Sequence, residues 1–516
     1  MRKKSALKNI VSKMIYSIVI TLLSFVSRRV FVSTLGDTLL GLNGLLTSVI
    51  SMLSLMELGV GNAIYFSLYE PLAENNEERI KSIMCLYQKL YRYIGLAVCI
   101  VGLCVIPFLK FLITQDIDYN YVYKIYLIFL ANSVMSYFMA YRRSLYSANQ
   151  KDYLINNVTT VVNIISYSLQ IITMLRYQNY VVYLLIQVIA TVSINLIFLL
   201  KSDRDYPYLR EKNVEPLPKE YKDTLVKNVK ALFMMSISGF AVFGTDNMLL
   251  TYFVGLGAVT IYGNYTTIIN MVNTTFNSML SNMKANVGNY LVTETKEKSY
   301  TLFKNLFFIN FLITGFTSVA TFTLASEFIR FWMGEKYVWS IWILAVLVFN
   351  MFSRYILEAA GVFINGAGMY NPYPLYKYIS LIEGGINLVV SIFLCKVLNF
   401  GVFGVFLGTS VSTVANTIAM PGVVYHHIFH KKIGEYYLLY AKYLILTVAF
   451  AAVSYGLFLL VHTPYTILNL VLGALISIGV MAAGVIVVFG RTEEFHYVLE
   501  TAKGFIKRRP AMKSQP

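Results

Sequence analysis

The sequence carries little charge for its length. Only 13% of its 516 residues are Asp, Glu, Lys or Arg, whereas a soluble domain has roughly 25%. Its mean hydropathy of +0.61 also argues against a soluble globular protein. The four cysteines have spacings that predict neither a disulfide framework nor a metal site. A Walker phosphate-binding loop is missing too, which argues against ATP hydrolysis by this chain.

Long apolar runs of about 20 residues recur along the whole chain instead, and a helix of that length crosses a bilayer core. We therefore predict an all-α polytopic membrane protein with fourteen transmembrane helices. The expected spans are 12–34, 39–66, 84–109, 120–142, 154–175, 180–200, 230–254, 259–287, 302–325, 340–364, 376–397, 401–425, 437–461 and 466–490. Several connections are very short, which favours antiparallel neighbouring helices.

The positive charges alternate along these spans. With the N-terminus inside, and with the four residues at each end of a span counted with the adjoining segment, 31 of the 43 Lys and Arg residues fall in inside segments and 5 in outside loops. Cytoplasmic segments of membrane proteins carry such an excess. The bias predicts cytoplasmic N- and C-termini. It also accounts for the net charge of +17 through topology and contact with anionic membrane lipids, and not through nucleic-acid binding.

Two pairs of similar segments indicate a duplication. LGDTLLGLNGLL (35–46) resembles LGAVTIYGNYTT (256–267), and YSANQKDY (146–153) lies opposite INGAGMYN (364–371), at the nearly equal offsets of 221 and 218. Repeats of this kind are typical of secondary transporters. We expect an N-lobe at 1–202, a cytoplasmic linker at 203–229, a C-lobe at 230–430, two further helices at 431–490 and a basic cytoplasmic tail at 491–516.

Two longer motifs resemble a known family. LMELGVGNAIYFSLYEPLAEN (55–75) and TDNMLLTYFVGLGAVTIYGNY (245–265) are similar to motifs of bacterial polysaccharide flippases in the multidrug/oligosaccharidyl-lipid/polysaccharide exporter superfamily. The resemblance implies a V-shaped bundle of two six-helix lobes around a central cavity. It also implies that the protein is a transporter and not an enzyme. Such a transporter moves an undecaprenyl-pyrophosphate-linked oligosaccharide across the bacterial cytoplasmic membrane by alternating access, for capsule or O-antigen synthesis.

The same resemblance sets the expected partners. We expect a monomer that needs no cofactor, with H⁺ or Na⁺ as candidate coupling ions. The polysaccharide polymerase machinery is a candidate partner.

A pyrophosphate cargo requires a cation within the membrane. Arg28 lies about 21 Å along the first helix from Met14, so snorkelling to the outer interface is one interpretation and anion binding is the other. Lipid II flippases of the same superfamily carry a first-helix Arg shortly before a Gly turn, as here before Gly36. Arg28 and Arg29 point about 100° apart, so we expect only one, Arg28, to face the cavity. Arg354 is the third candidate, and a structural pair with Glu358 is the alternative reading.

Three carboxylates are candidates for gating or ion coupling. Asp246 lies about 22 Å along the seventh helix from Ala231, at a depth similar to that of Arg28 on the first. A contact between the two would close an outer gate, whereas a helix-end carboxylate is the structural alternative. Glu358 is deep in the tenth helix, and Glu57 belongs to the first family motif.

Two polar stripes at helical spacing predict a surface for the glycan. Such stripes must face protein or water within a membrane, and interhelical hydrogen bonding is the alternative to cavity lining. The predicted lining residues are Asn156, Thr160, Asn163 and Gln170 on the fifth helix and Thr266, Asn270, Asn273 and Asn277 on the eighth.

Two other functions are compatible with the sequence. A multidrug-type antiporter of small cations would require an acidic cavity, and the cations inside the spans argue against it. A membrane polymerase or ligase of the same sugar pathway would require a larger outside loop than any predicted here.

Overall fold

The computed structural model describes residues 2–507 except 55–56, 58–60, 62–63, 65–66, 116, 212–213, 219–243, 282–283 and 368–373. Within these residues every regular element is helical, which confirms the all-α prediction. Ten helical segments of the described chain are long and apolar enough to cross a membrane. The count of fourteen stays a prediction. Most of the expected linker and the start of the seventh span lie outside the described residues.

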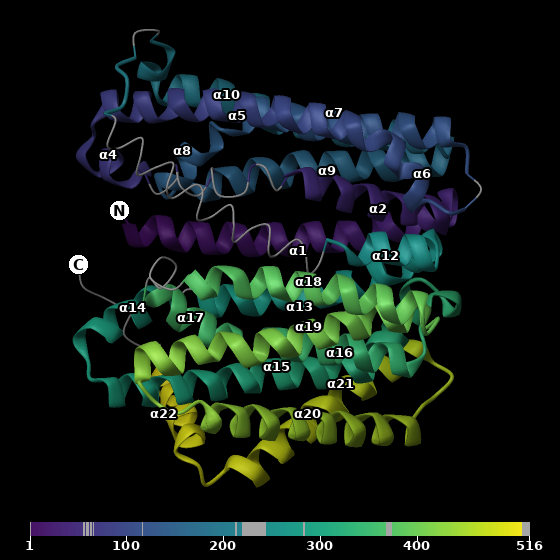
Figure 1. Cartoon of the computed structure of the whole chain (residues 1–516), viewed down its shortest axis with the longest axis vertical. Helices are drawn as coiled ribbons and strands as arrows, with labels where there is room; N and C mark the ends of the chain where they lie inside the picture. Colours follow the sequence, from purple (N-terminus) through teal and green to yellow (C-terminus); the bar gives the residue numbers. More distant parts are fainter. Residues whose placement is uncertain are drawn as a thin grey trace. The chain divides into compact units, whose positions relative to one another are not determined.

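The chain forms two compact units, residues 1–260 and 261–516. Figure 1 shows the long helices of each unit running side by side across the view. The N-terminal unit contains α1 (Arg2–Leu35), α2 (Asp37–Leu53), α4 (Tyr69–Glu74), α5 (Glu77–Val105), α6 (Leu109–Leu112), α7 (Tyr119–Ala140), α8 (Arg143–Ala148), α9 (Asp152–Tyr177), α10 (Tyr180–Asp205) and α12 (Asp246–Phe253). The 3₁₀ turns η2 (Ile106–Phe108) and η3 (Pro207–Arg210) complete it.

The second unit begins within α13 (Leu256–Ser281). It continues with α14 (Lys284–Thr293), α15 (Lys296–Trp332), η4 (Glu335–Tyr337), α16 (Ile341–Tyr355), α17 (Glu358–Gly366), α18 (Pro374–Lys396), α19 (Gly401–Val424), η5 (Tyr425–Phe429), α20 (Gly434–Leu460), α21 (Thr466–Phe489) and α22 (Glu493–Lys507). The amphipathic α22 occupies the start of the segment expected to be a tail.

Local sequence explains where the helices of the N-terminal unit end. Gly36 has φ of 88°, a conformation that side chains disfavour, and it separates α1 from α2. Asp118 caps α7 by accepting a hydrogen bond from the Asn120 amide at 2.9 Å. The side chain of Asn179 likewise accepts the Val181 amide at the start of α10. The connection between α9 and α10 is short and the two helices pack against each other, so they run antiparallel, as the short connections predicted.

Two glycines let α2 approach the start of α13 closely. A Cβ atom on Gly41 would lie 2.0 Å from the carbonyl oxygen of Leu256, and one on Gly44 would lie 2.8 Å from a methyl group of Val259. The Asn247 side chain adds a hydrogen bond of 2.8 Å to the Ser48 hydroxyl. The segment 35–46 thus packs within one unit against the first residues of the segment that resembles it.

The long helix α15 forms the centre of the C-terminal unit, where α16, α20 and α21 pack against it. Its core is aromatic: Phe311 stacks on Tyr443 of α20 with ring centroids 4.2 Å apart, and Phe307 lies 5.0 Å from Tyr436. These rings are buried in one apolar cluster.

The expected span 340–364 is interrupted in the structure. α16 ends at Tyr355 and α17 begins at Glu358. The cause lies on α15, where the buried Asn310 side chain donates hydrogen bonds of 2.9 Å to the carbonyl oxygens of Tyr355 and Ile356. A side chain that enters the backbone hydrogen-bond ladder bends or breaks a helix.

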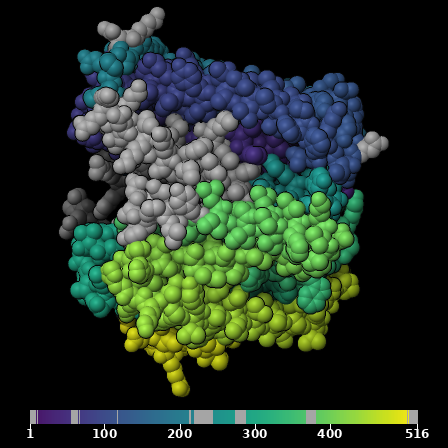
Figure 2. Space-filling model, in the orientation of Figure 1, coloured from purple at the N-terminus to yellow at the C-terminus, as the bar shows by residue number. Residues whose placement is uncertain are grey.

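The last two long helices present apolar side chains on their outer faces. Leu438, Leu460 and Val487 are 75%, 82% and 84% exposed. Figure 2 shows the green and yellow residues of this unit packed side by side on the face in view. Water would penalise such exposure and lipid would not, so the pattern fits a unit surrounded by membrane.

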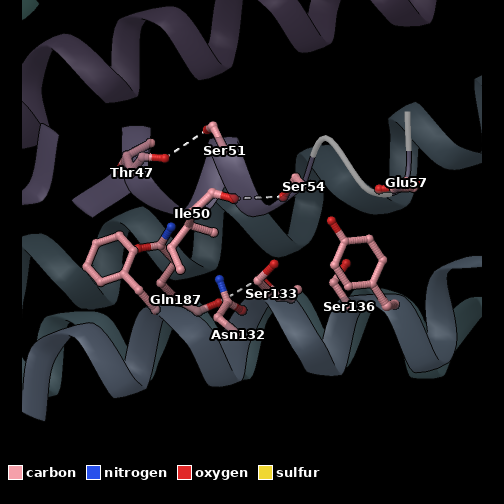
Figure 3. A pocket seen from close by; sticks show the side chains of 12 residues that line it. Thr47, Ile50, Ser51, Ser54, Glu57, Asn132, Ser133, Ser136 and Gln187 are labelled. Carbon is pink, nitrogen blue, oxygen red and sulfur yellow. Dashed lines mark hydrogen bonds between the residues drawn. The ribbon is translucent and has the colours of Figure 1, made fainter. Parts of the chain in front are cut away.

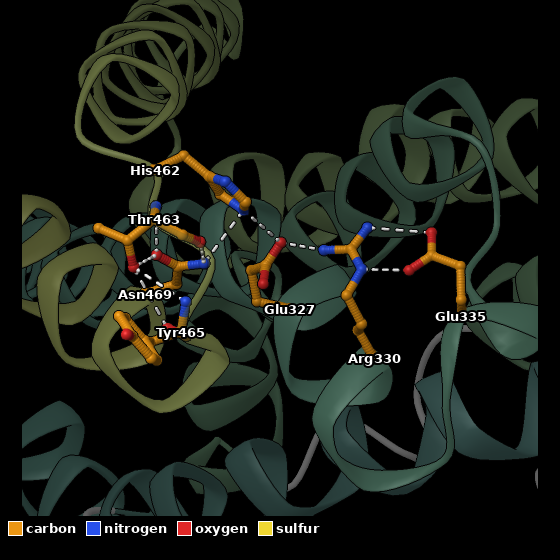
Figure 4. Close-up of polar contacts among 7 residues, drawn as sticks. All are labelled: Glu327, Arg330, Glu335, His462, Thr463, Tyr465 and Asn469. Atoms are coloured by element: carbon orange, nitrogen blue, oxygen red, sulfur yellow. Dashed lines mark hydrogen bonds and ion pairs between the residues drawn. The ribbon is translucent and has the colours of Figure 1, made fainter.

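A polar cluster ties these two helices to one end of α15 (Figure 4). The buried Glu327 carboxylate is paired with Arg330 and lies 3.2 Å from Nε2 of His462. Asn469 of α21 contacts the same histidine nitrogen at 3.1 Å. Arg330 also binds Glu335, and its hydrogen bond lowers the pKa of that carboxyl.

Candidate functional site

Arg28 is half-buried in the N-terminal unit. It lies on α1 between Ser27, which is buried, and Arg29, which is exposed. Its guanidinium donates a hydrogen bond of 2.9 Å to the backbone carbonyl of Thr260 at the start of α13. The Tyr183 side chain of α10 lies within electrostatic range of it. The helix therefore turns Arg28 toward other helices and Arg29 toward the surface, in the sense expected from their 100° separation.

The surroundings of Arg28 are built from residues far apart in sequence. The Thr260 hydroxyl donates to the Asp37 carbonyl at 2.6 Å, which links α13 to the first turn of α2. Phe31, one turn beyond Arg28, makes edge contacts with Tyr180 and Tyr183 at 5.3 and 5.2 Å. These contacts fix the segment of α1 that carries the arginine.

Asp246 is 1% exposed and occupies the first turn of α12. Its neighbour Asn247 anchors that turn to α2. The structure places both Asp246 and Arg28 in the N-terminal unit. A gating role for Asp246 stays a prediction.

Arg354 of the C-terminal unit lies at the break between α16 and α17. Among the carboxylates around it, Glu383 of α18 has the strongest electrostatic interaction, ahead of Glu358. Glu383 is 4% exposed, and one of its oxygens accepts a hydrogen bond of 2.9 Å from Asn416 of α19. Sequence reasoning missed Glu383, although an acid within an apolar run is the same signal that identified Arg354.

Glu57 follows α2 in a turn and borders a polar cavity inside the N-terminal unit (Figure 3). The Tyr91 hydroxyl of α5 donates to its carboxylate, and the Tyr87 hydroxyl donates to Tyr91 at 3.0 Å. The cavity has a volume of about 370 Å³. Its lining comprises Thr47, Ile50 and Ser51 of α2, Ser54 directly after α2, Glu57, Phe129, Asn132, Ser133, Ser136 and Tyr137 of α7, and Gln187 and Thr191 of α10.

The residues that line this cavity are not those of the predicted glycan stripes. On α9, Asn156 hydrogen-bonds Ser12 of α1 at 3.2 Å, and Gln170 donates to the Tyr183 carbonyl at 3.2 Å. Those two residues therefore join helices. Thr160 donates to its own helix, and Asn163 is half-buried.

The second stripe lies on α13. Its Thr266 hydroxyl donates to the Tyr262 carbonyl at 3.0 Å, and Asn270 is exposed. The side chains of Asn273 and Asn277 lie outside the described residues. Glycan lining by either stripe stays a prediction.

Solved structures with a similar fold are membrane transporters and flippases. The lipid II flippase MurJ in an inward closed conformation aligns with a TM-score of 0.64 and 13% identity over 92% of this chain and 98% of its own. An inward-facing multidrug resistance MATE family transporter of the MOP superfamily gives 0.60 and 14%, over 80% and 97%. The Vibrio cholerae MATE transporter VcmN gives 0.57 and 14%, over 83% and 99%.

The protein is thus a multi-pass membrane protein with the fold of the MOP superfamily. No curated protein sequence matches it. The model of the polysaccharide biosynthesis protein family matches residues 6–283, and the chain belongs to that family. The family resemblance predicted from the two motifs is confirmed.

Proposed function

We propose that this protein translocates a lipid-linked oligosaccharide, carried on undecaprenyl pyrophosphate, across the bacterial cytoplasmic membrane by alternating access. The family and the fold support transport in polysaccharide synthesis. The excess of Lys and Arg in the expected inside segments supports cytoplasmic termini. The observation that carries the proposal is the inward placement of Arg28 on an apolar helix.

A charged side chain inside a membrane is costly, about 2.5–3.5 kcal/mol on insertion scales, and such residues mark functional pathways. Arg28 binds a neutral backbone carbonyl at Thr260. A pyrophosphate oxygen is a stronger, charge-assisted acceptor than a neutral carbonyl. An arriving pyrophosphate would therefore compete with the Thr260 carbonyl for the guanidinium. Loss of that hydrogen bond would then change the contact between α1 and α13 when the cargo binds.

In the C-terminal unit, Arg354 is the second proposed pyrophosphate ligand, with Glu383 nearby as its counter-charge. Arg29 is exposed, so we give it a smaller part than Arg28 in binding the pyrophosphate. Asp246, Glu358 and Glu57 are the proposed gating or ion-coupling groups. The buried position of Asp246 supports a role that depends on desolvation.

The test is export of surface polysaccharide in cells that produce Arg28→Gln or Arg29→Gln at equal protein levels. Arg29→Gln is the matched control, since it removes the neighbouring charge from the exposed side. We expect Arg28→Gln to abolish most export and Arg29→Gln to retain it. Equal export by both variants would contradict the anion site.

A deletion strain separates the alternatives. Loss of surface polysaccharide with repeat units retained inside the cell supports the flippase. Normal polysaccharide together with new sensitivity to cationic drugs would instead support a multidrug antiporter.

A further inference from the structure

The polar cavity of the N-terminal unit has a distinctive pattern of hydrogen-bonding groups. On its α2 wall, three hydroxyls donate to carbonyls of their own helix: Thr47 to Asn43 at 2.7 Å, Ser51 to Thr47 at 2.8 Å and Ser54 to Ile50 at 3.0 Å. A hydroxyl has one donor and two acceptor lone pairs. With their donors used, these oxygens present acceptors to the cavity.

The α7 wall adds an acceptor that has no partner. The carbonyl oxygen of the Asn132 side chain is buried and accepts no hydrogen bond from the residues that the structure describes. A buried polar atom without a partner is costly, and such atoms call for an explanation. Asn132 itself lines a cavity of about 370 Å³, and rotation of its amide would bring this oxygen to a ligand that donates to it.

Charge narrows the class of ligand. The lining contains one carboxylate, Glu57, and no Lys or Arg. Arg143 of α8 interacts electrostatically with Glu57, which offsets that charge. A phosphate or a uronic acid brings further acceptors and negative charge to a wall already rich in acceptors, so the cavity disfavours both.

The cavity also has apolar surfaces. The rings of Phe129 and Tyr137 belong to the lining, together with the Ile50 side chain. A pyranose ring has hydroxyl donors on its rim and C–H groups on its faces. Acceptors next to aromatic rings match both features, and the volume lies within the usual range for small-molecule sites.

We propose that this cavity binds one uncharged pyranose ring of the transported glycan. The inference rests on the proposed function and gives the sugar a subsite separate from the arginine that meets the pyrophosphate. The hydroxyl donors of the sugar satisfy Asn132 and the α2 hydroxyl oxygens. Phe129 and Tyr137 contact its faces.

The test is saturation-transfer NMR on the full-length protein in nanodiscs. The probes are the methyl glycosides of glucose, galactose, mannose and N-acetylglucosamine, with methyl glucuronide as the charged comparison. We expect at least one uncharged glycoside to bind and the glucuronide to give no signal. Absence of binding by every uncharged glycoside, or equal binding of the glucuronide, would overturn the proposal.

Variants then locate the site. Ser51→Val removes one acceptor of the cavity, whereas Ser168→Val removes an exposed hydroxyl of α9 that does not line it. Loss of one hydrogen bond should weaken glycoside binding about five-fold in Ser51→Val, with no change in Ser168→Val. Equal effects of the two variants would place the sugar elsewhere.

Asn132→Leu distinguishes a ligand-binding role from a structural one. It removes a buried oxygen that has no partner, so the melting temperature should stay equal or rise while glycoside binding falls. A lower melting temperature with unchanged binding would contradict the proposal. Normal polysaccharide export in a deletion strain would refute the flippase and leave this binding result standing, so the two failures are distinguishable.

Discussion

Replacement of Gly41 by alanine tests the packing of α2 against the start of α13. The new Cβ atom would lie 2.0 Å from the Leu256 carbonyl oxygen, 2.6 Å from its carbonyl carbon and 3.0 Å from its Cα atom. All three are backbone atoms, so no side-chain rotation relieves the overlap. The two helices must separate by about 1 Å or more, since heavy atoms in contact stand about 3.5–4.0 Å apart.

Overpacking of this kind costs about 1–3 kcal/mol, and a rigid backbone neighbour places Gly41→Ala at the upper end. Separation would also lengthen the Arg28 to Thr260 contact of 2.9 Å, because Thr260 follows Leu256 by one helical turn. We therefore expect a lower melting temperature and reduced polysaccharide export together.

The assay is thermal unfolding of purified protein in detergent, beside export measured at matched protein levels. Gly257→Ala is the control, because a Cβ atom there meets nothing within 4 Å. Alanine also favours a helix over glycine by about 1 kcal/mol, so the control should be neutral or slightly stabilising. Equal melting temperatures for the Gly41 and Gly257 variants would refute the argument.

Three further predictions follow from other contacts. Gly44→Ala should destabilise less than Gly41→Ala, since its Cβ atom would meet a side-chain methyl group of Val259, at 2.8 Å, and not backbone atoms. Val259→Ala should restore the stability of Gly44→Ala in a double-mutant cycle, and additive losses would contradict this. Glu327→Gln should lower the free energy of unfolding by about 1–3 kcal/mol in thermal unfolding, because the Glu327 carboxylate is 6% exposed and paired. Glu335 is 71% exposed, so Glu335→Gln should change that free energy by less than about 1 kcal/mol. A larger loss for Glu335→Gln than for Glu327→Gln would contradict the burial argument. Lys81→Met removes ion pairs of 2.8 and 2.7 Å, one of which reaches the segment after η3, so limited proteolysis should cut residues 205–218 faster; an unchanged cleavage rate would show that this segment is held by other contacts.

Much of the fold could be predicted because membrane helices carry their signal locally. An apolar run of sufficient length indicates a span regardless of its neighbours. The 100° step between adjacent helical residues likewise anticipated the separate environments of Arg28 and Arg29. The similarity between the segments that contain Gly41 and Leu256 was visible in the sequence, although the close backbone contact between them was not.

Other features depend on residues that meet only after packing. The break after Tyr355 is caused by Asn310, 45 residues earlier on another helix, and no motif near Tyr355 indicates it. The polar cavity draws on α2, α7 and α10. Its residues Thr47, Ser51 and Ser54 recur at helical spacing in the sequence, but their meeting with α7 and α10 depends on packing. Conversely, the α9 stripe at Asn156 and Gln170 had the right period, and both residues make hydrogen bonds to other helices.

The central claim is that the protein moves a lipid-linked oligosaccharide between leaflets and that Arg28 takes part. The direct measurement uses proteoliposomes containing undecaprenyl-pyrophosphate oligosaccharide and follows the accessibility of the glycan to a membrane-impermeant glycosidase. We predict that the wild-type protein exposes glycan initially sheltered in the inner leaflet, and that Arg28→Gln does so at least ten-fold more slowly while Arg29→Gln stays near the wild-type rate. A rate in wild-type proteoliposomes equal to that in protein-free liposomes, or equal rates for wild type and Arg28→Gln, would contradict the account.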